Sequence, residues 1–109
     1  MATTYKVLGT SNPAPTTATT LYTVPGATSA IVSTINICNQ ATSTATFRLA
    51  VRPSGATLAT NHYLAYDTII PANDSIALTL GITLAATDVI TVYASNSTTS
   101  FLAFGTEIT

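Results

Sequence analysis

The sequence alternates short runs of strand-favouring residues with turn residues, at intervals of about ten positions. Threonine, isoleucine, valine and tyrosine dominate the runs, and such side chains suit a pleated, half-buried surface. We therefore predict an all-β fold, namely one eight-stranded antiparallel β-sandwich of jelly-roll or Ig-like type with short turns, spanning residues 1–109. The predicted strands are Tyr5–Leu8, Thr20–Val24, Ser29–Cys38, Ala45–Arg52, His62–Ile70, Ser75–Leu80, Val89–Ala94 and Ser100–Ile108.

Prolines and glycines supply the breaks between these runs. Pro13 and Pro15 have no main-chain N–H to donate to a sheet, so we expect residues 10–19 to form an extended N-terminal arm or a loop. Pro25-Gly26 places a fixed φ before a permissive one, which suits a turn. No long helix is expected anywhere in the chain.

Successive side chains of a strand point to opposite faces, so alternation predicts which residues form the core. The rows expected between the two sheets are Ile31, Ile35 and Ile37; Phe47, Leu49 and Val51; Ile76, Leu78 and Leu80; and Leu102, Phe104 and Ile108. The opposite faces are expected to be rich in Thr, Ala and Ser, and such flat, weakly hydrated faces can pack against another subunit.

The chain is almost uncharged, with three Lys or Arg and four Asp or Glu residues among 109 and a net charge of −1. It lacks the clustered cations that bind nucleic acid or a membrane surface. No apolar run approaches the roughly 20 residues that span a bilayer, and no signal-peptide region follows the first residues, so we expect synthesis in a cytoplasm. The composition favours a protein packed in an assembly over a freely diffusing enzyme.

Candidate catalytic residues are few and scattered. His62 is the only histidine, and no nucleophile-elbow motif surrounds any serine. The acidic residues stand apart in the sequence, and the glycines form no phosphate-binding loop. We therefore predict that the protein is not an enzyme and needs neither a cofactor nor a metal.

Six residues are candidates for an interface. Arg48 and Arg52 share one face of a predicted strand, where they could select a partner or be ordinary solvated charges. Their natural acidic partners are Asp67 and Glu107, within the subunit or across a subunit boundary. Tyr63 and Tyr66 carry an apolar ring with a polar tip, which suits a protein interface or a sugar-binding platform.

Several blocks of the sequence also resemble a known class of proteins. They include Leu21-Tyr-Thr-Val-Pro25, Phe47-Arg-Leu-Ala-Val-Arg-Pro53, His62-Tyr-Leu-Ala-Tyr-Asp67 and Thr87-Asp-Val-Ile-Thr-Val-Tyr93. Together they resemble small virion-associated proteins of tailed bacteriophages, including phages of cyanobacteria. The resemblance implies a compact β-sandwich that adds to a capsid or tail, often as a trimer, and it carries over no catalytic residue.

The function expected from these observations is capsid decoration. Such a cement protein would stabilise the phage head through contacts with itself, as a homotrimer, and with a major capsid protein or tail protein. It would be made in the bacterial host cytoplasm and be located in the virion. A tail, baseplate or fibre component is the first alternative, and a carbohydrate-binding or adhesion module is the second.

Overall fold

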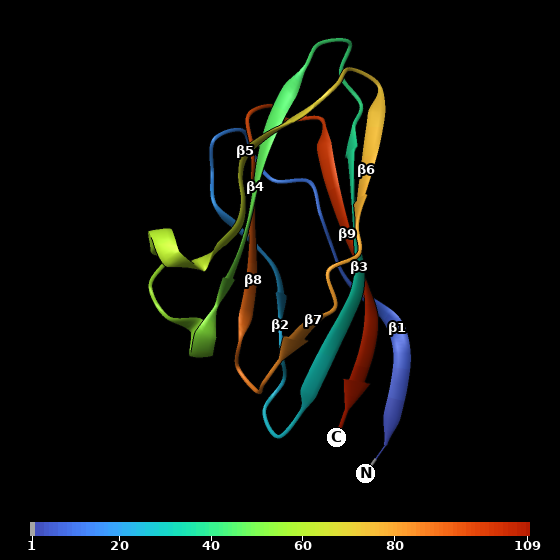
Figure 1. The fold of residues 1–109 in the computed structure, drawn as a ribbon, viewed down its shortest axis with the longest axis vertical. Coiled ribbons are helices and arrows are strands. Elements are labelled where there is room, and N and C mark those ends of the chain that lie inside the picture. The colour runs from blue at the N-terminus through green and yellow to red at the C-terminus, as the bar shows by residue number, and fades with distance from the viewer. Residues whose placement is uncertain (1) are drawn as a thin grey trace.

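A computed structural model describes residues 2–109 and places most of them in strands (Figure 1). The strands are β1 (Thr3–Ser11), β2 (Thr19–Thr23), β3 (Ser29–Asn39), β4 (Ala45–Arg52), β5 (Tyr63–Ile70), β6 (Asp74–Leu78), β7 (Ile82–Leu84), β8 (Val89–Ala94) and β9 (Thr99–Ile108). Two short 3-10 helices, η1 (Pro53–Gly55) and η2 (Thr60–His62), lie between β4 and β5. The fold is all-β, as the sequence predicts.

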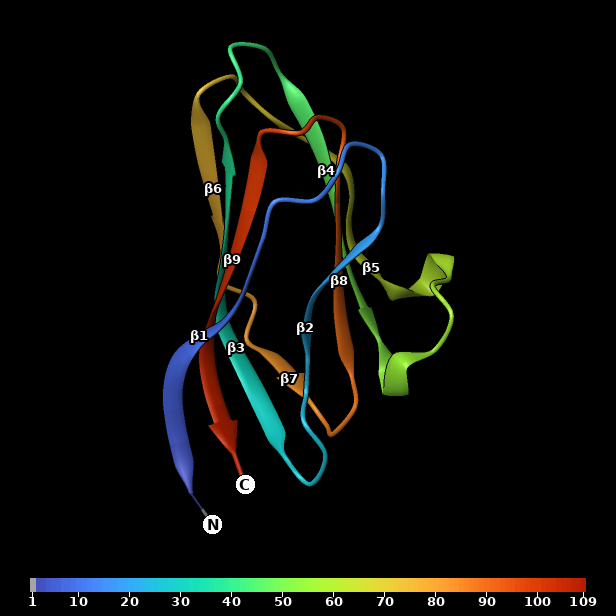
Figure 2. The ribbon, with the colours of Figure 1, turned by 180° about the vertical axis from the view of Figure 1, so that it is seen from behind.

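The strands form two antiparallel sheets that face each other (Figures 1 and 2). The first sheet has the order β1-β9-β3-β6, with β7 also paired to β3, and the second has the order β2-β8-β4-β5. The chain passes repeatedly from one sheet to the other, so most neighbouring strands are distant in sequence. The two ends of the chain lie side by side, because Ala2 and Thr109 exchange main-chain hydrogen bonds of 3.2 and 2.9 Å.

Side chains from both sheets form one hydrophobic core between them. Phe47 of β4 and Phe101 of β9 lie at its centre, edge to face, with their ring centroids 6.3 Å apart. Ile35, Ile37 and Leu49 are also fully buried, which confirms the alternation expected for these parts of β3 and β4. This core fixes which face of each sheet is left to meet other molecules.

A bulge in β3 overturns one predicted core position. The register of β3 against β9 shifts between Val32 and Thr34, so Ser33 is an extra residue in the strand. An extra residue reverses the alternation of faces. As a result Val32 is buried and Ile31, expected in the core with Ile35, is 41% exposed on the outward face.

The predicted face of β9 is also wrong. Phe101 and Ala103 are fully buried, whereas Leu102 and Phe104, which alternate with them, point away from the core. Phe104 is 37% exposed. Both faces of this strand are apolar, so periodicity alone cannot tell the inner face from the outer one.

The structure has nine strands where eight are predicted, because the segment opposite β3 is divided into β6 and β7. Both pair with β3, through Ile37 opposite Ile76 and Ile31 opposite Thr83. Gly81 lies between them with a φ of +63°, a left-handed conformation that interrupts a strand and that glycine adopts without strain. Leu80, predicted for the core, falls in this break and is exposed.

Residues 10–19 do not extend away from the fold as an arm. The first of them complete β1, the last begins β2, and those between form a connecting loop. In this loop Thr16 donates its main-chain N–H to the Ala94 carbonyl at 2.8 Å, and Pro13 is buried. The loop thus carries the chain from the first sheet to the second.

Asn39, at the end of β3, ties together several loops at one end of the molecule. Its side chain is fully buried, and each polar atom of that side chain has more than one partner. The two N–H groups of the side-chain nitrogen reach three main-chain carbonyls, one N–H being shared, and the oxygen accepts two hydrogen bonds; the partners are Ser43, Ile70, Pro71, Ala41 and Asn96. A buried polar group that is satisfied in this way specifies one arrangement of the loops.

Candidate interaction surfaces

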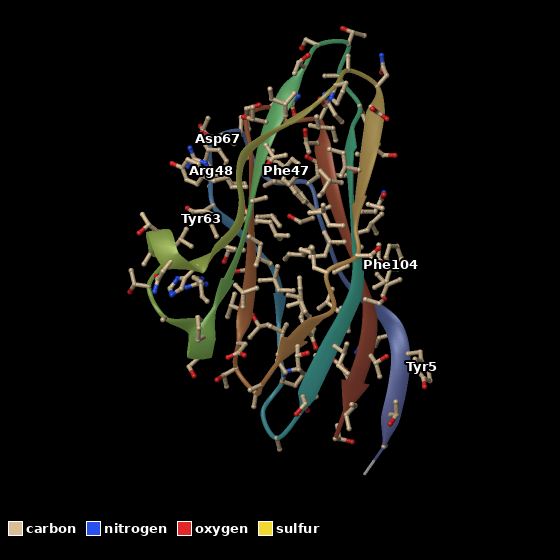
Figure 3. All side chains as sticks on the ribbon, in the orientation of Figure 1. Tyr5, Phe47, Arg48, Tyr63, Asp67 and Phe104 are labelled. Atoms are coloured by element: carbon tan, nitrogen blue, oxygen red, sulfur yellow. The ribbon has the colours of Figure 1, made fainter. Side chains whose placement is uncertain are left out.

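The outward face of the first sheet exposes a row of apolar side chains. Val7, Phe104 and Thr34 lie directly opposite one another on β1, β9 and β3, and the next row contains Tyr5 and Ile31. Tyr5 is 81% exposed and Val7 50% exposed. Figure 3 shows Tyr5 and Phe104 pointing away from the core.

No charged side chain within residues 2–109 faces outward from this sheet. Its strands contain three charged residues, Lys6, Asp74 and Glu107. Lys6 and Glu107 lie between the outward-facing residues of β1 and β9, so their side chains are on the inner face of the sheet. Asp74 lies opposite the buried Asn39, which places it on the inner face too. The exposed apolar side chains are interleaved with threonines such as Thr34 and Thr106, and an uncharged face of this kind is suited to binding another protein.

The outward face of the second sheet is different, because an ion pair and three tyrosines gather there. β5 places two residues, Tyr66 and Asp67, opposite Arg48 alone, and this bulge turns both of their side chains toward it. The Arg48 Nε lies 2.6 Å from Asp67 Oδ1, and its Nη2 lies 3.2 Å from Oδ2. These hydrogen bonds hold the pKa of the Asp67 carboxyl below its ordinary value and raise the pKa of Arg48.

Aromatic rings enclose the Arg48 guanidinium on two sides. Tyr93 lies opposite Arg48 on β8, with its ring centre 4.2 Å from the guanidinium carbon, and the Tyr66 ring centre is 4.1 Å away. Tyr63 packs edge to face on Tyr66, with 4.9 Å between ring centroids. The guanidinium of Arg48 is thus satisfied within the subunit, by the two rings and by its two hydrogen bonds to Asp67. The cluster therefore presents an aromatic surface and no unpaired positive charge.

Arg52 lies on the same face of β4 but supports a loop. Its Nε donates to the Thr91 hydroxyl at 3.0 Å, and its Nη1 donates to the Gly55 and Ala56 carbonyls at 3.4 and 3.0 Å. The guanidinium therefore holds the chain at η1 against the sheet. No carboxylate pairs with Arg52 in the described part of the chain.

Glu107, the other expected partner of the arginines, joins the two sheets instead. Its carboxylate lies 2.9 Å from the Lys6 ammonium and accepts a 2.5 Å hydrogen bond from the Tyr22 hydroxyl of β2. The bonds from Lys6 and Tyr22 keep the pKa of Glu107 below its ordinary value. Burial, followed by the bond to the charged carboxylate, raises the pKa of Tyr22.

His62, the one histidine of the sequence, makes its side-chain hydrogen bond inside its own loop. Its Nδ1 accepts the Ala59 N–H at 3.1 Å. Among residues 2–109 there is no cluster of three or more His, Cys, Asp or Glu side chains that could hold a metal ion. Within the same range, no helix is both long and apolar enough to cross a membrane.

Four of the six candidate residues therefore come together, namely Arg48, Tyr63, Tyr66 and Asp67. Figure 3 labels Arg48, Tyr63 and Asp67 of this group. Arg52 lies elsewhere on the same face and Glu107 on the other sheet. The sequence did not predict that Tyr93 belongs to this cluster, because its place opposite Arg48 is fixed by strand pairing. Sequence reasoning also missed the outward apolar face of the first sheet, for which the alternation of Tyr5 and Val7 around Lys6 was an available signal.

Comparison with known proteins adds no relative, since no protein-family model matches the chain and no curated protein matches it significantly. A functional assignment therefore has to be argued from the surfaces themselves.

Proposed function

We propose that this protein is a structural component of a bacteriophage particle, one that decorates the capsid head and stabilises it through protein contacts. The outward face of the first sheet carries the proposal, because it is uncharged and exposes Tyr5, Val7, Ile31 and Phe104. An apolar face on a chain with a net charge of −1 is suited to lie against another protein surface.

The strand pairing supports a jelly-roll architecture. β1 pairs with β9, β2 with β8, β3 with both β6 and β7, and β4 with β5. Each pair therefore encloses the next one along the chain, as the two arms of a single long hairpin would. Taken as one strand interrupted at Gly81, β6 and β7 give the eight strands of a jelly roll. Viral capsid domains and lectins use this architecture, which favours a virion protein by analogy of fold alone.

The proposed mechanism is adhesion to the major capsid protein. The largest apolar patch of a typical monomer measures about 300 Å² at the low end of its range. If about that much of the first sheet's face is buried, the gross stabilisation is about 7.5 kcal/mol at about 25 cal/mol per Å². The loss of translational and rotational freedom offsets much of this in each copy. Many weak contacts repeated over a shell nevertheless resist internal pressure together. The protein would be made in the bacterial cytoplasm and reside in the virion.

Particles that lack the protein provide the test. We expect them to assemble but to release their genome at lower temperature than complete particles do, and in low salt that complete particles withstand. Added purified protein should restore resistance, whereas the Phe104→Ser variant should not, because it removes an apolar side chain from the middle of the docking face.

Leu64→Ser is the matched control for this experiment. Leu64 is 48% exposed, but it lies on β5 in the second sheet. This variant should restore resistance as well as the unchanged protein does. Equal heat and salt resistance of particles with and without the protein would refute the cement role.

A further inference from the structure

Within residues 2–109, β1 has a neighbouring strand on only one side. It pairs with β9, and its other edge is open to solvent (Figures 1 and 2). The stretch from Thr3 to Val7 is regular, because the first register shift lies between Val7 and Gly9. An open strand edge presents unpaired main-chain donors and acceptors, which is a template for another strand.

The hydrogen bonds at the chain ends show which groups face this edge. Ala2 and Thr109 exchange both of their main-chain hydrogen bonds, so they form a hydrogen-bonded pair of the antiparallel ladder. Such pairs alternate with pairs whose N–H and C=O groups point the other way. The N–H and C=O groups of Thr3, Tyr5 and Val7 therefore point to the open edge, and the side chains of these residues lie on the uncharged outward face.

The remaining sheet edges are less suited to pairing. β5 has two register shifts, and Asp67 adopts a positive φ of 49°. β2 has five residues and a register shift, while β6 and β7 have five and three residues and are separated by the break at Gly81. Bulges, short strands and charged side chains are features by which proteins protect their edges. Between Thr3 and Val7, β1 has no bulge, and its one charged residue, Lys6, is paired with Glu107 of the same sheet.

We propose that the open edge of β1 pairs with the same edge of a second copy of this chain, antiparallel, across a two-fold axis at Tyr5. In this register Tyr5 lies opposite Tyr5 of the second copy, and Thr3 lies opposite Val7 at both ends. The three pairs exchange six main-chain hydrogen bonds. The first sheets of the two copies join into one continuous sheet with one continuous apolar face.

The charge of Lys6 excludes one alternative register and is compatible with a second copy as the occupant. Lys6 is the only charged residue of β1, and the axis at Tyr5 places it opposite Thr4 of the second copy. An axis at Lys6 would place two ammonium groups opposite each other, which is destabilising. In addition, Glu107 of β9 holds the Lys6 ammonium at 2.9 Å, on the side away from the open edge. The edge is thus self-complementary and free of repulsion.

The size of the contact sets the expected affinity. Five residues from each strand and one tyrosine ring from each copy bury less than the roughly 800 Å² per partner of a standard interface. We therefore expect a weak dimer, with a dissociation constant of about 10 μM. This contact does not depend on the proposed role in a capsid.

The test is the mass of the purified chain in sedimentation equilibrium, over a range from about 1 to 500 μM that brackets this affinity. The unchanged protein should shift from monomer to dimer. Tyr5→Lys and Tyr5→Glu should each remain monomeric, because each places like charges across the axis. An equimolar mixture of these two variants should form a heterodimer. Since the Tyr5 side chain is 81% exposed, both variants should keep the circular dichroism of the folded chain.

Leu64→Lys and Leu64→Glu, at an exposed position of the second sheet, are the matched controls and should dimerise like the unchanged protein. A monomer at every concentration would overturn the inference, and so would a trimer. Dimerisation of Tyr5→Lys on its own, or a mixture of the Tyr5 variants that stays monomeric, would show that the two copies do not meet at Tyr5.

Discussion

Replacing Asn39 with Asp should destabilise the fold by about 2 kcal/mol, because the change removes the two N–H donors that join loops and each contributes about 1 kcal/mol. The Asn39 nitrogen lies 2.9, 3.3 and 3.1 Å from the carbonyl oxygens of Ser43, Ile70 and Pro71. A carboxylate has the same shape but faces those carbonyls with an acceptor. Its other oxygen can still accept the Ala41 N–H, so the loss is confined to the donor side.

The same substitution should make stability depend on pH. Three facing carbonyls and complete burial disfavour the charged form, so they raise the pKa of the introduced carboxyl above its unfolded value. A raised folded-state pKa means that stability is greatest at low pH and is lost as pH rises through that value. The loss of unfolding free energy caused by Asn39→Asp should therefore be smaller at pH 4 than at pH 7.

Urea denaturation followed by circular dichroism measures both effects. Asn61→Asp is the matched control, since Asn61 is exposed in η2 and its replacement should change the free energy of unfolding by less than about 0.5 kcal/mol. A loss below about 1 kcal/mol for Asn39→Asp, or the same pH profile for both variants, would refute the account of this buried amide.

Three further predictions concern the contact between the sheets and the bulge in β3. Tyr22→Phe removes the hydrogen bond to the Glu107 carboxylate and should cost about 1.5–3 kcal/mol of unfolding free energy in urea; a loss below about 0.5 kcal/mol would contradict this. Because the folded-state pKa of Glu107 is lowered, its contribution should be present at neutral pH and be lost as pH falls below about 4.5, the ordinary value. Glu107→Gln should therefore flatten the acid branch of the stability profile, and an unchanged branch would count against the assignment. Gly105→Ala should lower the melting temperature strongly, since a Cβ there would collide with the Ile31 carbonyl, whereas Gly26→Ala, where a Cβ has open space, should not.

Local sequence signals account for much of the fold. Strand-favouring runs and turn residues locate most strands to within about two residues, for example β4 at Ala45–Arg52 and β8 at Val89–Ala94. They do not reveal the bulge at Ser33, because an extra residue is fixed by pairing with β9 and not by its own side chain. The break at Gly81 is likewise visible only once β6 and β7 are seen to share one partner strand.

The candidate surfaces, too, could be predicted from the sequence only where they do not depend on strand pairing. Alternation correctly places Arg48 and Arg52 on one face, because an uninterrupted strand keeps its period. The meeting of Arg48 with Tyr66 and Asp67 depends on a bulge in another strand, which the sequence does not disclose. Ile31 and Phe104 of the outward face are expected in the core from the sequence, because hydrophobic periodicity identifies apolar rows but not the side on which a second sheet lies.

Electron microscopy of the proposed phage particles tests the central claim most directly. We expect density for the chain on the head in hundreds of copies, with the face that bears Phe104 and Ile31 against the major capsid protein. A few dozen copies confined to the tail would contradict the head assignment and favour a tail component. Particles without density for the chain, or with this face turned to solvent, would contradict the claim that the first sheet binds the capsid.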